Sequence, residues 1–121
     1  MKRTVAAVDD NEDLLFTIKF GLSEYDKTID VITFNNPEEF LKEANKTKFD
    51  LILLDIMMPQ KNGWDTFAEI TQSKKNGKTP IIFLTAKTDK QSQTLGSFGA
   101  KEFITKPFKI PELVNTIKKY V

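Results

Sequence analysis

One short segment limits the possible folds of this chain more than any other: the apolar run Leu51–Leu54, which ends at Asp55. A strand with one face in solvent alternates apolar and polar residues, because successive side chains point to opposite faces of the sheet. An unbroken apolar run instead indicates a strand that is covered on both faces, as at the centre of a parallel sheet. The run therefore predicts an α/β fold in layers.

Similar short runs, rich in β-branched residues, alternate along the chain with segments of helical periodicity. The predicted strands are Thr4–Val8, Ile29–Phe34, Leu51–Leu54, Ile81–Leu84 and Glu102–Thr105. The predicted helices are Glu12–Tyr25 with Leu14, Ile18, Leu22 and Tyr25 on one face, a helix that starts at Asn36-Pro37, a helix with Trp64 and Phe67, a helix near Lys90–Phe98, and Ile110–Tyr120. Five strands that alternate with five helices predict a parallel sheet with right-handed crossovers between two helical layers.

The amino-acid composition limits the kinds of binding site and catalysis that this chain can support. The 121 residues are 40% hydrophobic and 29% charged, which is ordinary for one globular domain. Lysine and arginine number 18 and aspartate and glutamate 17, so a nucleic-acid binder with a broad basic surface is not expected. The sequence has no cysteine and no histidine, which excludes disulfides, thiolate or histidine metal sites, and catalysis by either residue. Carboxylates, hydroxyls, lysine or a bound cation remain.

Nothing in the sequence predicts a targeting or membrane segment. The apolar run that follows Met1 is short and soon meets Asp9-Asp10, which is unlike a secretory signal. No stretch approaches the ~20 apolar residues of a membrane helix. We therefore expect a cytoplasmic protein without membrane insertion, and one domain over residues 1–121. The sequence leaves open whether it acts alone or is a fragment of a longer protein.

Polar residues stand where four of the predicted strands end. Asp9-Asp10 follow the first strand, Asp55 the third, Thr85 the fourth and Lys106 the fifth. In open parallel sheets, sites lie beyond the carboxyl ends of the strands, so these groups should share one edge. Three crowded carboxylates repel one another unless a hard cation such as Mg²⁺ lies among them. Mg²⁺ and a lysine can neutralise a transferring phosphoryl group, which an aspartate can attack at phosphorus.

These residues also resemble a known family in their order and spacing. Val8-Asp9-Asp10, Leu53-Leu54-Asp55-Ile56-Met57-Met58-Pro59 with Gly63, Leu84-Thr85-Ala86 and Phe103-Ile104-Thr105-Lys106-Pro107-Phe108 resemble the receiver domain of two-component response regulators. The resemblance covers essentially the whole chain and includes single-domain chemotaxis regulators. It implies a flavodoxin-like (βα)5 three-layer sandwich with strand order 2-1-3-4-5. It also implies a phosphoacceptor signalling protein that is not an enzyme, although it carries chemistry for its own phosphorylation and dephosphorylation.

The resemblance assigns the metal site and the phosphoacceptor. Asp55 would accept the phosphoryl group. Asp10 would bind Mg²⁺, or Mn²⁺, directly, and Asp9 mostly through water. Asp55 and the backbone carbonyl of Met57 would complete the protein ligands. Met57 and Lys87, two residues after Asp55 and Thr85, would tune the rate of dephosphorylation.

The resemblance also assigns the groups that respond to phosphorylation. Lys106 would pair with the phosphoryl group, and Thr85 would donate a hydrogen bond to it and move inward. Phe103 would be the switch aromatic and would move from exposed to buried. The Lys106-Pro107 bond would be cis and would aim the lysine into the site.

Partners follow from the same resemblance. The phosphodonor would be a sensor histidine kinase or a phosphotransfer protein. A downstream protein would bind the surface formed by the fourth helix, fifth strand and last helix, and the chain would be a monomer, with a phosphorylation-driven dimer as an open alternative. The kinase, the signal and the downstream partner stay open.

Other interpretations are weaker. Taken singly, Asp9-Asp10 could cap a helix, Asp55 could end a strand in a turn, and Phe103 could be plain core. A phosphate-binding P-loop would need a glycine-rich turn after the first strand, where the chain has acids. An aspartate-nucleophile phosphatase would need a second acid where Met57 stands. A phosphorylation-silent, receiver-like interaction module remains the alternative.

Overall fold

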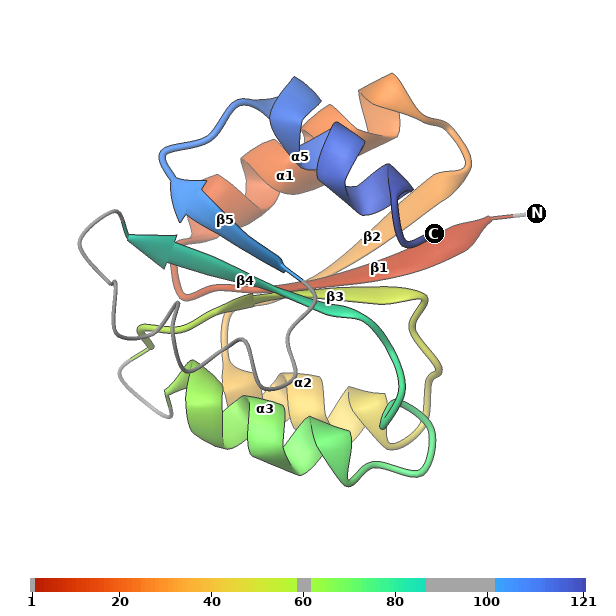
Figure 1. Ribbon diagram of the computed structural model, residues 1–121, viewed down its shortest axis with the longest axis vertical. Coiled ribbons are helices and arrows are strands. Elements are labelled where there is room, and N and C mark those ends of the chain that lie inside the picture. The colour runs from red at the N-terminus through yellow and green to blue at the C-terminus, as the bar shows by residue number, and fades with distance from the viewer. Residues whose placement is uncertain (1, 59–61, 87–101) are drawn as a thin grey trace.

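The computed structural model describes residues 2–58, 62–86 and 102–121 and shows a parallel five-stranded sheet in the order β2-β1-β3-β4-β5. The strands are β1 (Arg3–Val8), β2 (Ile29–Phe34), β3 (Leu51–Asp55), β4 (Ile81–Ala86) and β5 (Glu102–Lys106). The helices are α1 (Glu12–Tyr25), α2 (Pro37–Ala44), α3 (Gly63–Thr71) and α5 (Ile110–Lys118). Helices α1 and α5 cover one face of the sheet, and α2 and α3 cover the other (Figure 1). The predicted fold is confirmed; the predicted helix near Lys90–Phe98 lies outside the described residues.

Strand β3 is buried along its whole length, as its unbroken apolar sequence predicts. Leu51 and Leu53 belong to the core cluster beneath α1 and α5, whereas Ile52 and Leu54 belong to the cluster beneath α2 and α3. Each such side chain stabilises the fold by about 1.5–3 kcal/mol relative to an exposed one. The central strand thus places Asp55, its last residue, at the rim of both cores.

Helix α1 has the bounds that the sequence predicts, Glu12–Tyr25, and ends in an exposed tyrosine. Asn11 caps it, because the side-chain oxygen accepts a hydrogen bond from the Leu14 amide at 3.1 Å. Ile18 and Leu22 are buried, whereas Tyr25, on the same face in the last turn, is 57% exposed. Periodicity gives a direction around the helix axis and does not say whether another element lies opposite the last turn.

The edges of the predicted elements shift where the β ladder continues. Ala86 pairs with Lys106, so β4 runs two residues beyond Leu84 and β5 includes the lysine. Helix α5 ends at Lys118, before Tyr120, whose hydroxyl donates a 2.7 Å hydrogen bond to the Glu102 carboxylate. Across the described ranges, the model contains no helix with the length and apolar character that a membrane span requires.

A buried asparagine joins the loops at the opposite end of the sheet from the strand-end carboxylates. The Asn76 side chain is fully buried and donates to the carbonyls of Ala44 at 2.7 Å and Thr47 at 2.9 Å. Its oxygen accepts from the Phe49 amide at 2.9 Å and the Thr79 hydroxyl at 3.0 Å. From the sequence, only a turn is expected here. These bonds connect the end of α2, the start of β3 and the segment before β4.

Candidate functional site

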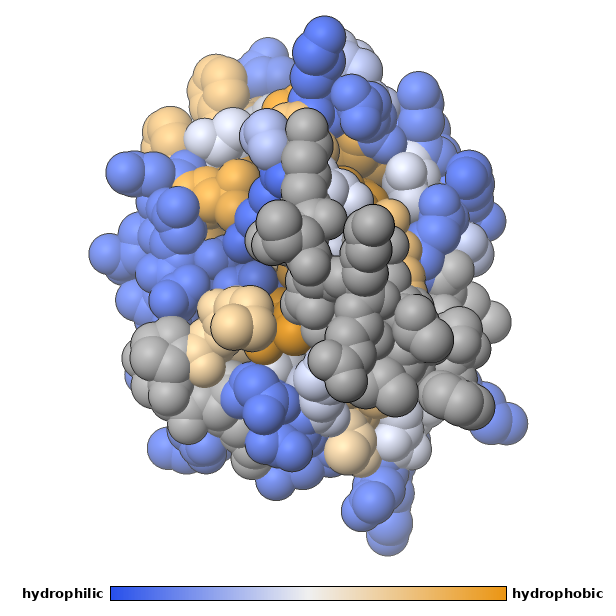
Figure 2. Space-filling model, turned by 60° about the vertical axis from the view of Figure 1, so that its left-hand side comes forward, coloured by the Kyte–Doolittle hydropathy of each residue, from blue (hydrophilic) through white to orange (hydrophobic). Residues whose placement is uncertain are grey.

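The polar strand ends do meet at one edge of the sheet. Asp9 and Asp10 follow β1, Asp55 ends β3, Thr85 lies near the end of β4, and Lys106 ends β5. The arrowheads of the strands point to this edge, at the left of Figure 1, and Figure 2 brings it toward the viewer. Hydrophilic residues make up most of the described surface in that view and surround smaller hydrophobic areas. One carboxylate oxygen from each of the three aspartates lies within 4.8 Å of the others.

The three carboxylates differ in their exposure. Asp9 is 0% and Asp55 4% exposed, whereas Asp10 is exposed. Both oxygens of Asp9 are engaged, one by the Asn11 amide at 2.9 Å and the other by the Lys106 ammonium at 2.7 Å. Asp10 makes no hydrogen bond or ion pair with any residue that the structure describes, so its carboxylate is the one open to a ligand.

Lys106 is the cation of the site. Its Nζ lies 2.7 Å from Oδ2 of Asp9 and 3.3 Å from Oδ1 of Asp55. Burial by itself lowers the pKa of this ammonium, but the hydrogen bond to Asp9 and the charges of Asp55 and Asp9 outweigh burial and raise the pKa above its ordinary value. Lys106 therefore stays charged and neutralises part of the acid cluster.

One lysine does not balance the cluster. Burial raises the pKa of the Asp55 carboxyl, the charge of Asp9 raises it further, and Lys106 only partly offsets both, so the pKa rises to about 6. A carboxylate with this pKa gains from a cation more than an ordinary surface aspartate does. Three carboxylate oxygens within 4.8 Å are the hard, charged donors that Mg²⁺ prefers, so the residues present fit that ion.

The raised pKa of Asp55 predicts a pH-dependent stability in EDTA. Its folded-state pKa of about 6 lies above the unfolded value of 3.8, so the folded state binds more protons between these values. The free energy of unfolding should therefore fall as pH rises from about 4 to about 6, by about 1–2 kcal/mol after allowing for solvent screening at the open edge. Urea titrations at several pH values would measure this. A slope unchanged in Asp55→Asn would contradict the assignment.

Gly63 holds the chain that follows Asp55. Its amide donates a 2.7 Å hydrogen bond to the Ile56 carbonyl. A Cβ at this position would lie 2.6 Å from the Ile56 Cα and 2.7 Å from the Asp55 carbonyl oxygen, so only glycine permits this approach. The Met57 amide lies 3.4 Å from Oδ1 of Asp55, and the Met57 side chain is 68% exposed beside the site. The start of α3 thus fixes the segment that carries the predicted Met57 ligand.

The predicted switch residues lie on β4 and β5. Thr85 is 1% exposed. Phe103 is half-buried rather than exposed, and its ring stacks on Phe83 with centroids 5.6 Å apart. The Lys106-Pro107 peptide bond is cis. Lys87 lies outside the described residues.

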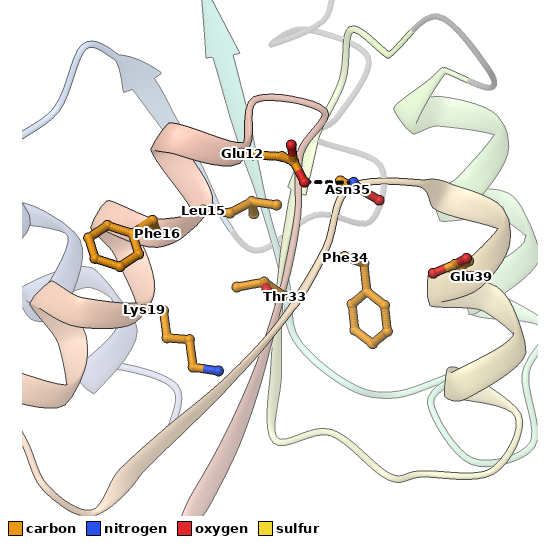
Figure 3. Close-up of a pocket in the computed structure, with 8 residues that line it drawn as sticks. All are labelled: Glu12, Leu15, Phe16, Lys19, Thr33, Phe34, Asn35 and Glu39. Carbon is orange, nitrogen blue, oxygen red and sulfur yellow. Dashed lines mark hydrogen bonds between the residues drawn. The ribbon is translucent and has the colours of Figure 1, made fainter.

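Two cavities lie near the carboxyl ends of the strands. One of about 410 Å³ adjoins the site and is lined by Asn11, Leu14, Lys106, Pro107 and Phe108. The other, of about 350 Å³, lies between α1 and the end of β2, where Glu12 accepts a 3.0 Å hydrogen bond from Asn35 (Figure 3). None of the strand-end carboxylates lines the second cavity, so we give it no part in the site.

Two capping residues next to the site are missing from the sequence-based prediction. Asn11 caps α1, gives its amide to Asp9 and lines the cavity beside Lys106. Asn62 caps α3, its side-chain oxygen accepting from the Asp65 amide at 2.9 Å, and so supports Gly63. An asparagine directly before an acidic first helical turn is the signal that could have identified both.

Curated proteins with similar sequences match nearly the whole chain. The alkaline phosphatase synthesis transcriptional regulatory protein PhoP of Bacillus subtilis is 35% identical over 119 residues, 98% of this chain and 48% of that protein. The response regulator ArlR of Staphylococcus saprophyticus is 36% identical over 115 residues, 94% of this chain and 50% of that protein. The chain spans about half the length of these relatives.

Solved structures give the same result. The chemotaxis protein CheY4 of Vibrio cholerae is 27% identical, with a TM-score of 0.92 and full coverage of both chains. The BeF3-activated receiver domain of DrrB, from Thermotoga maritima, is 29% identical, with a TM-score of 0.86 over 99% of this chain and 97% of that one. The family model of the response regulator receiver domain matches residues 5–118. The chain therefore belongs to the response regulator receiver domain family.

Proposed function

We propose that Asp55 accepts a phosphoryl group from the phosphohistidine of a sensor histidine kinase or phosphotransfer protein, or from a small phosphodonor. One observation carries the proposal: the Asp55 carboxylate lies 3.3 Å from the Lys106 ammonium and within 4.8 Å of the Asp9 and Asp10 oxygens. A nucleophile, a cation and a set of metal ligands thus converge on one point. Residues 1–121 would act as a single receiver domain.

The chemistry assigned to the chain is a nucleophilic displacement. An oxygen of Asp55 attacks phosphorus, a new P–O bond forms, and the bond to the donor breaks with its electron pair leaving on the donor. Asp9, Asp10, Asp55 and the carbonyl of Met57 would hold Mg²⁺ or Mn²⁺, which supplies positive charge to the phosphoryl oxygens when bound. Hydrolysis of the acyl phosphate later regenerates the carboxylate.

The pairings in the structure support a rearrangement after transfer. Lys106 is bonded to Asp9 and Asp55, and a phosphoryl group on Asp55 would offer it a stronger anionic partner. Thr85, two residues from Phe83 on β4, would donate its hydroxyl to the phosphoryl group. Phe103 stacks on Phe83 from β5, so a shift of Thr85 would reach that ring pair.

The output of the chain is then a change of surface. We place the downstream protein on β5, α5 and the predicted helix near Lys90–Phe98, which lies outside the described residues. A monomer in the cytoplasm, without direct binding of nucleic acid, completes the proposal. The curated relatives are about twice as long as this chain. Control of a further domain by this receiver is therefore also a proposal.

Acetyl phosphate tests the phosphoacceptor directly. We expect intact-protein mass spectrometry to show one added phosphoryl mass with Mg²⁺ and none with EDTA. The added mass should be lost in hydroxylamine, which cleaves acyl phosphates. An unchanged mass with Mg²⁺ would exclude acetyl phosphate as a donor and leave two cases, a receiver that needs its own kinase and the phosphorylation-silent interaction module. An added mass that resists hydroxylamine would place the phosphoryl group elsewhere.

The environment of the acyl phosphate predicts a long lifetime. Met57 is large, apolar and 68% exposed beside Asp55, so it should hinder an attacking water more than a small polar residue would. Lys87 should act in the same sense. We expect Met57→Asn to shorten the phosphorylated lifetime several-fold, with Met57→Leu as the matched control. Following the phosphorylated mass with time measures this; loss from the unmodified chain within seconds would contradict it.

A further inference from the structure

The sequence contains two asparagines that directly precede glycine, Asn62-Gly63 and Asn76-Gly77. An asparagine in this context is chemically labile, because glycine has no Cβ to shield its amide nitrogen from the preceding side chain. The nitrogen can attack the side-chain carbonyl carbon and close a five-membered ring. The structure gives the two pairs opposite environments, so it decides which of them can react.

Asn76 is held in place. It is 0% exposed, and its side chain makes four hydrogen bonds that join three segments of the fold. Attack by the Gly77 nitrogen would need all four to break and the side chain to turn within a packed interior. Opening of this kind costs a large part of the global free energy of unfolding.

Asn62 is exposed and lies directly before the first residue of α3. Its side-chain oxygen accepts one hydrogen bond, from the Asp65 amide at 2.9 Å, and the Gly63 amide makes one, to the Ile56 carbonyl at 2.7 Å. The bond from Asp65 belongs to the first turn of the nine-residue helix α3, whereas the bond from the buried Gly63 amide joins that turn to the segment after β3. Reaction at Asn62 needs these two bonds to open at a helix end, whereas reaction at Asn76 needs four to open inside the fold, so Asn62 opens more often.

We propose that Asn62 is a site of spontaneous deamidation in the folded protein and that Asn76 is not. The Gly63 nitrogen gives up its proton and forms a bond to Cγ of Asn62, and ammonia leaves with the amide nitrogen. Water then opens the succinimide at either carbonyl, which yields aspartate or isoaspartate at position 62. No electrons are exchanged, and the formal net charge falls from +1 to 0.

The modification lies against the candidate site. A Cβ on Gly63 would come within 2.7 Å of the Asp55 carbonyl oxygen, so the chain at position 63 is in close contact with the strand that ends in Asp55. Isoaspartate inserts a methylene into the backbone immediately before that contact. We infer that the isoaspartyl form loses the Gly63–Ile56 bond and positions Asp55 less well. This second step rests on the proposed function, whereas the deamidation itself does not.

The first measurement needs no phosphorylation. Protein aged in mildly alkaline buffer is digested with an endoproteinase that cleaves after glutamate, so that Asn62 falls in the peptide 44–69 and Asn76 in the peptide 70–102. We expect the mass change from amide to acid to accumulate in the first peptide at least ~10-fold faster, a difference of about 1.4 kcal/mol in opening. Equal rates, a faster change at Asn76, or no change at either site while the unfolded chain reacts would overturn the proposal.

Two variants locate the change. Asn62→Ser keeps an oxygen that can cap α3 but cannot form the ring, so the mass change in peptide 44–69 should disappear. Asn45, in the same peptide but followed by lysine, is the internal control; a mass change that persists in Asn62→Ser would assign the reaction to Asn45 and contradict the proposal.

The consequence for the site is tested separately. Aged and fresh protein are compared for phosphorylation by acetyl phosphate, with Asn62→Asp as the variant that carries the new charge without the extra methylene. We expect aged protein to be phosphorylated several-fold more slowly, and Asn62→Asp to resemble fresh protein. Equal rates for aged and fresh protein would overturn the second step alone. If fresh protein is not phosphorylated at all, the proposed transfer from a small phosphodonor fails, and the peptide measurement still decides the deamidation.

Discussion

Replacing Asp55 with asparagine should abolish Mg²⁺-dependent phosphorylation by acetyl phosphate and leave the fold intact. The amide has nearly the same shape as the carboxylate, but it carries no negative charge and is not a nucleophile toward phosphorus. Asp55 is 4% exposed, and removal of its charge relieves repulsion from Asp9 in metal-free solution. The variant should therefore be at least as stable as the unmodified chain at neutral pH in EDTA, since the lost carboxylate is the one whose pKa rises to about 6.

Intact-protein mass spectrometry with Mg²⁺ measures this loss, and circular dichroism checks the fold. Asp30→Asn is the matched control, because Asp30 is an exposed aspartate on β2 and should leave labelling unchanged. Labelling of the Asp55 variant at the rate of the unmodified chain would show that another residue accepts the phosphoryl group. A variant that fails to fold would instead contradict the stability argument.

Asn76→Ala should lower the free energy of unfolding more than any of the substitutions of Asp30, Asn45, Asp55 or Asn62. The substitution leaves the carbonyls of Ala44 and Thr47, the Phe49 amide and the Thr79 hydroxyl without the partner that they have now. Buried groups that lose a partner cost about 1–3 kcal/mol each, so the total should be on the order of 3–4 kcal/mol if the groups relax in part. For a domain of this size, that is about 12–16 °C in Tm.

Urea denaturation and a thermal scan measure the effect. Asn45→Ala removes an exposed asparagine close to the same loops and is the control, with an expected change within about 0.5 kcal/mol. Phosphorylation of the Asn76 variant should be normal while it is folded, because Asn76 lies away from the carboxylates. A loss below about 1 kcal/mol would mean that water replaces the asparagine without cost.

Much of this molecule could be predicted from short-range patterns. The unbroken run Leu51–Leu54 indicates a strand covered on both faces, and the structure buries all of it. The residue types at the strand ends suffice to place carboxylates and a lysine at one edge, because parallel strands end on the same side of a sheet. Helix α1 has the predicted bounds, since the helical spacing of Leu14, Ile18, Leu22 and Tyr25 marks its extent.

The rest depends on distances between residues that are far apart in sequence. The sequence around Asn76 does not indicate hydrogen-bond partners that lie 27 to 32 residues away. Lys106 and Asp9 are 97 residues apart, and they pair only once the whole sheet has assembled. The exposure of Tyr25 has a related cause: the helical period is correct, but whether another element covers the last turn is a property of the whole fold.

The aromatic contacts on the α3 side of the sheet give the chain a built-in optical probe. Its single tryptophan, Trp64, has its ring centroid 4.7 Å from that of Phe83, which in turn stacks on Phe103. Indole emission responds to changes in the packing and polarity around the ring. A displacement of Phe103 should therefore alter the intrinsic fluorescence of Trp64 through Phe83, so that addition of beryllofluoride and Mg²⁺ could be followed in real time without a label.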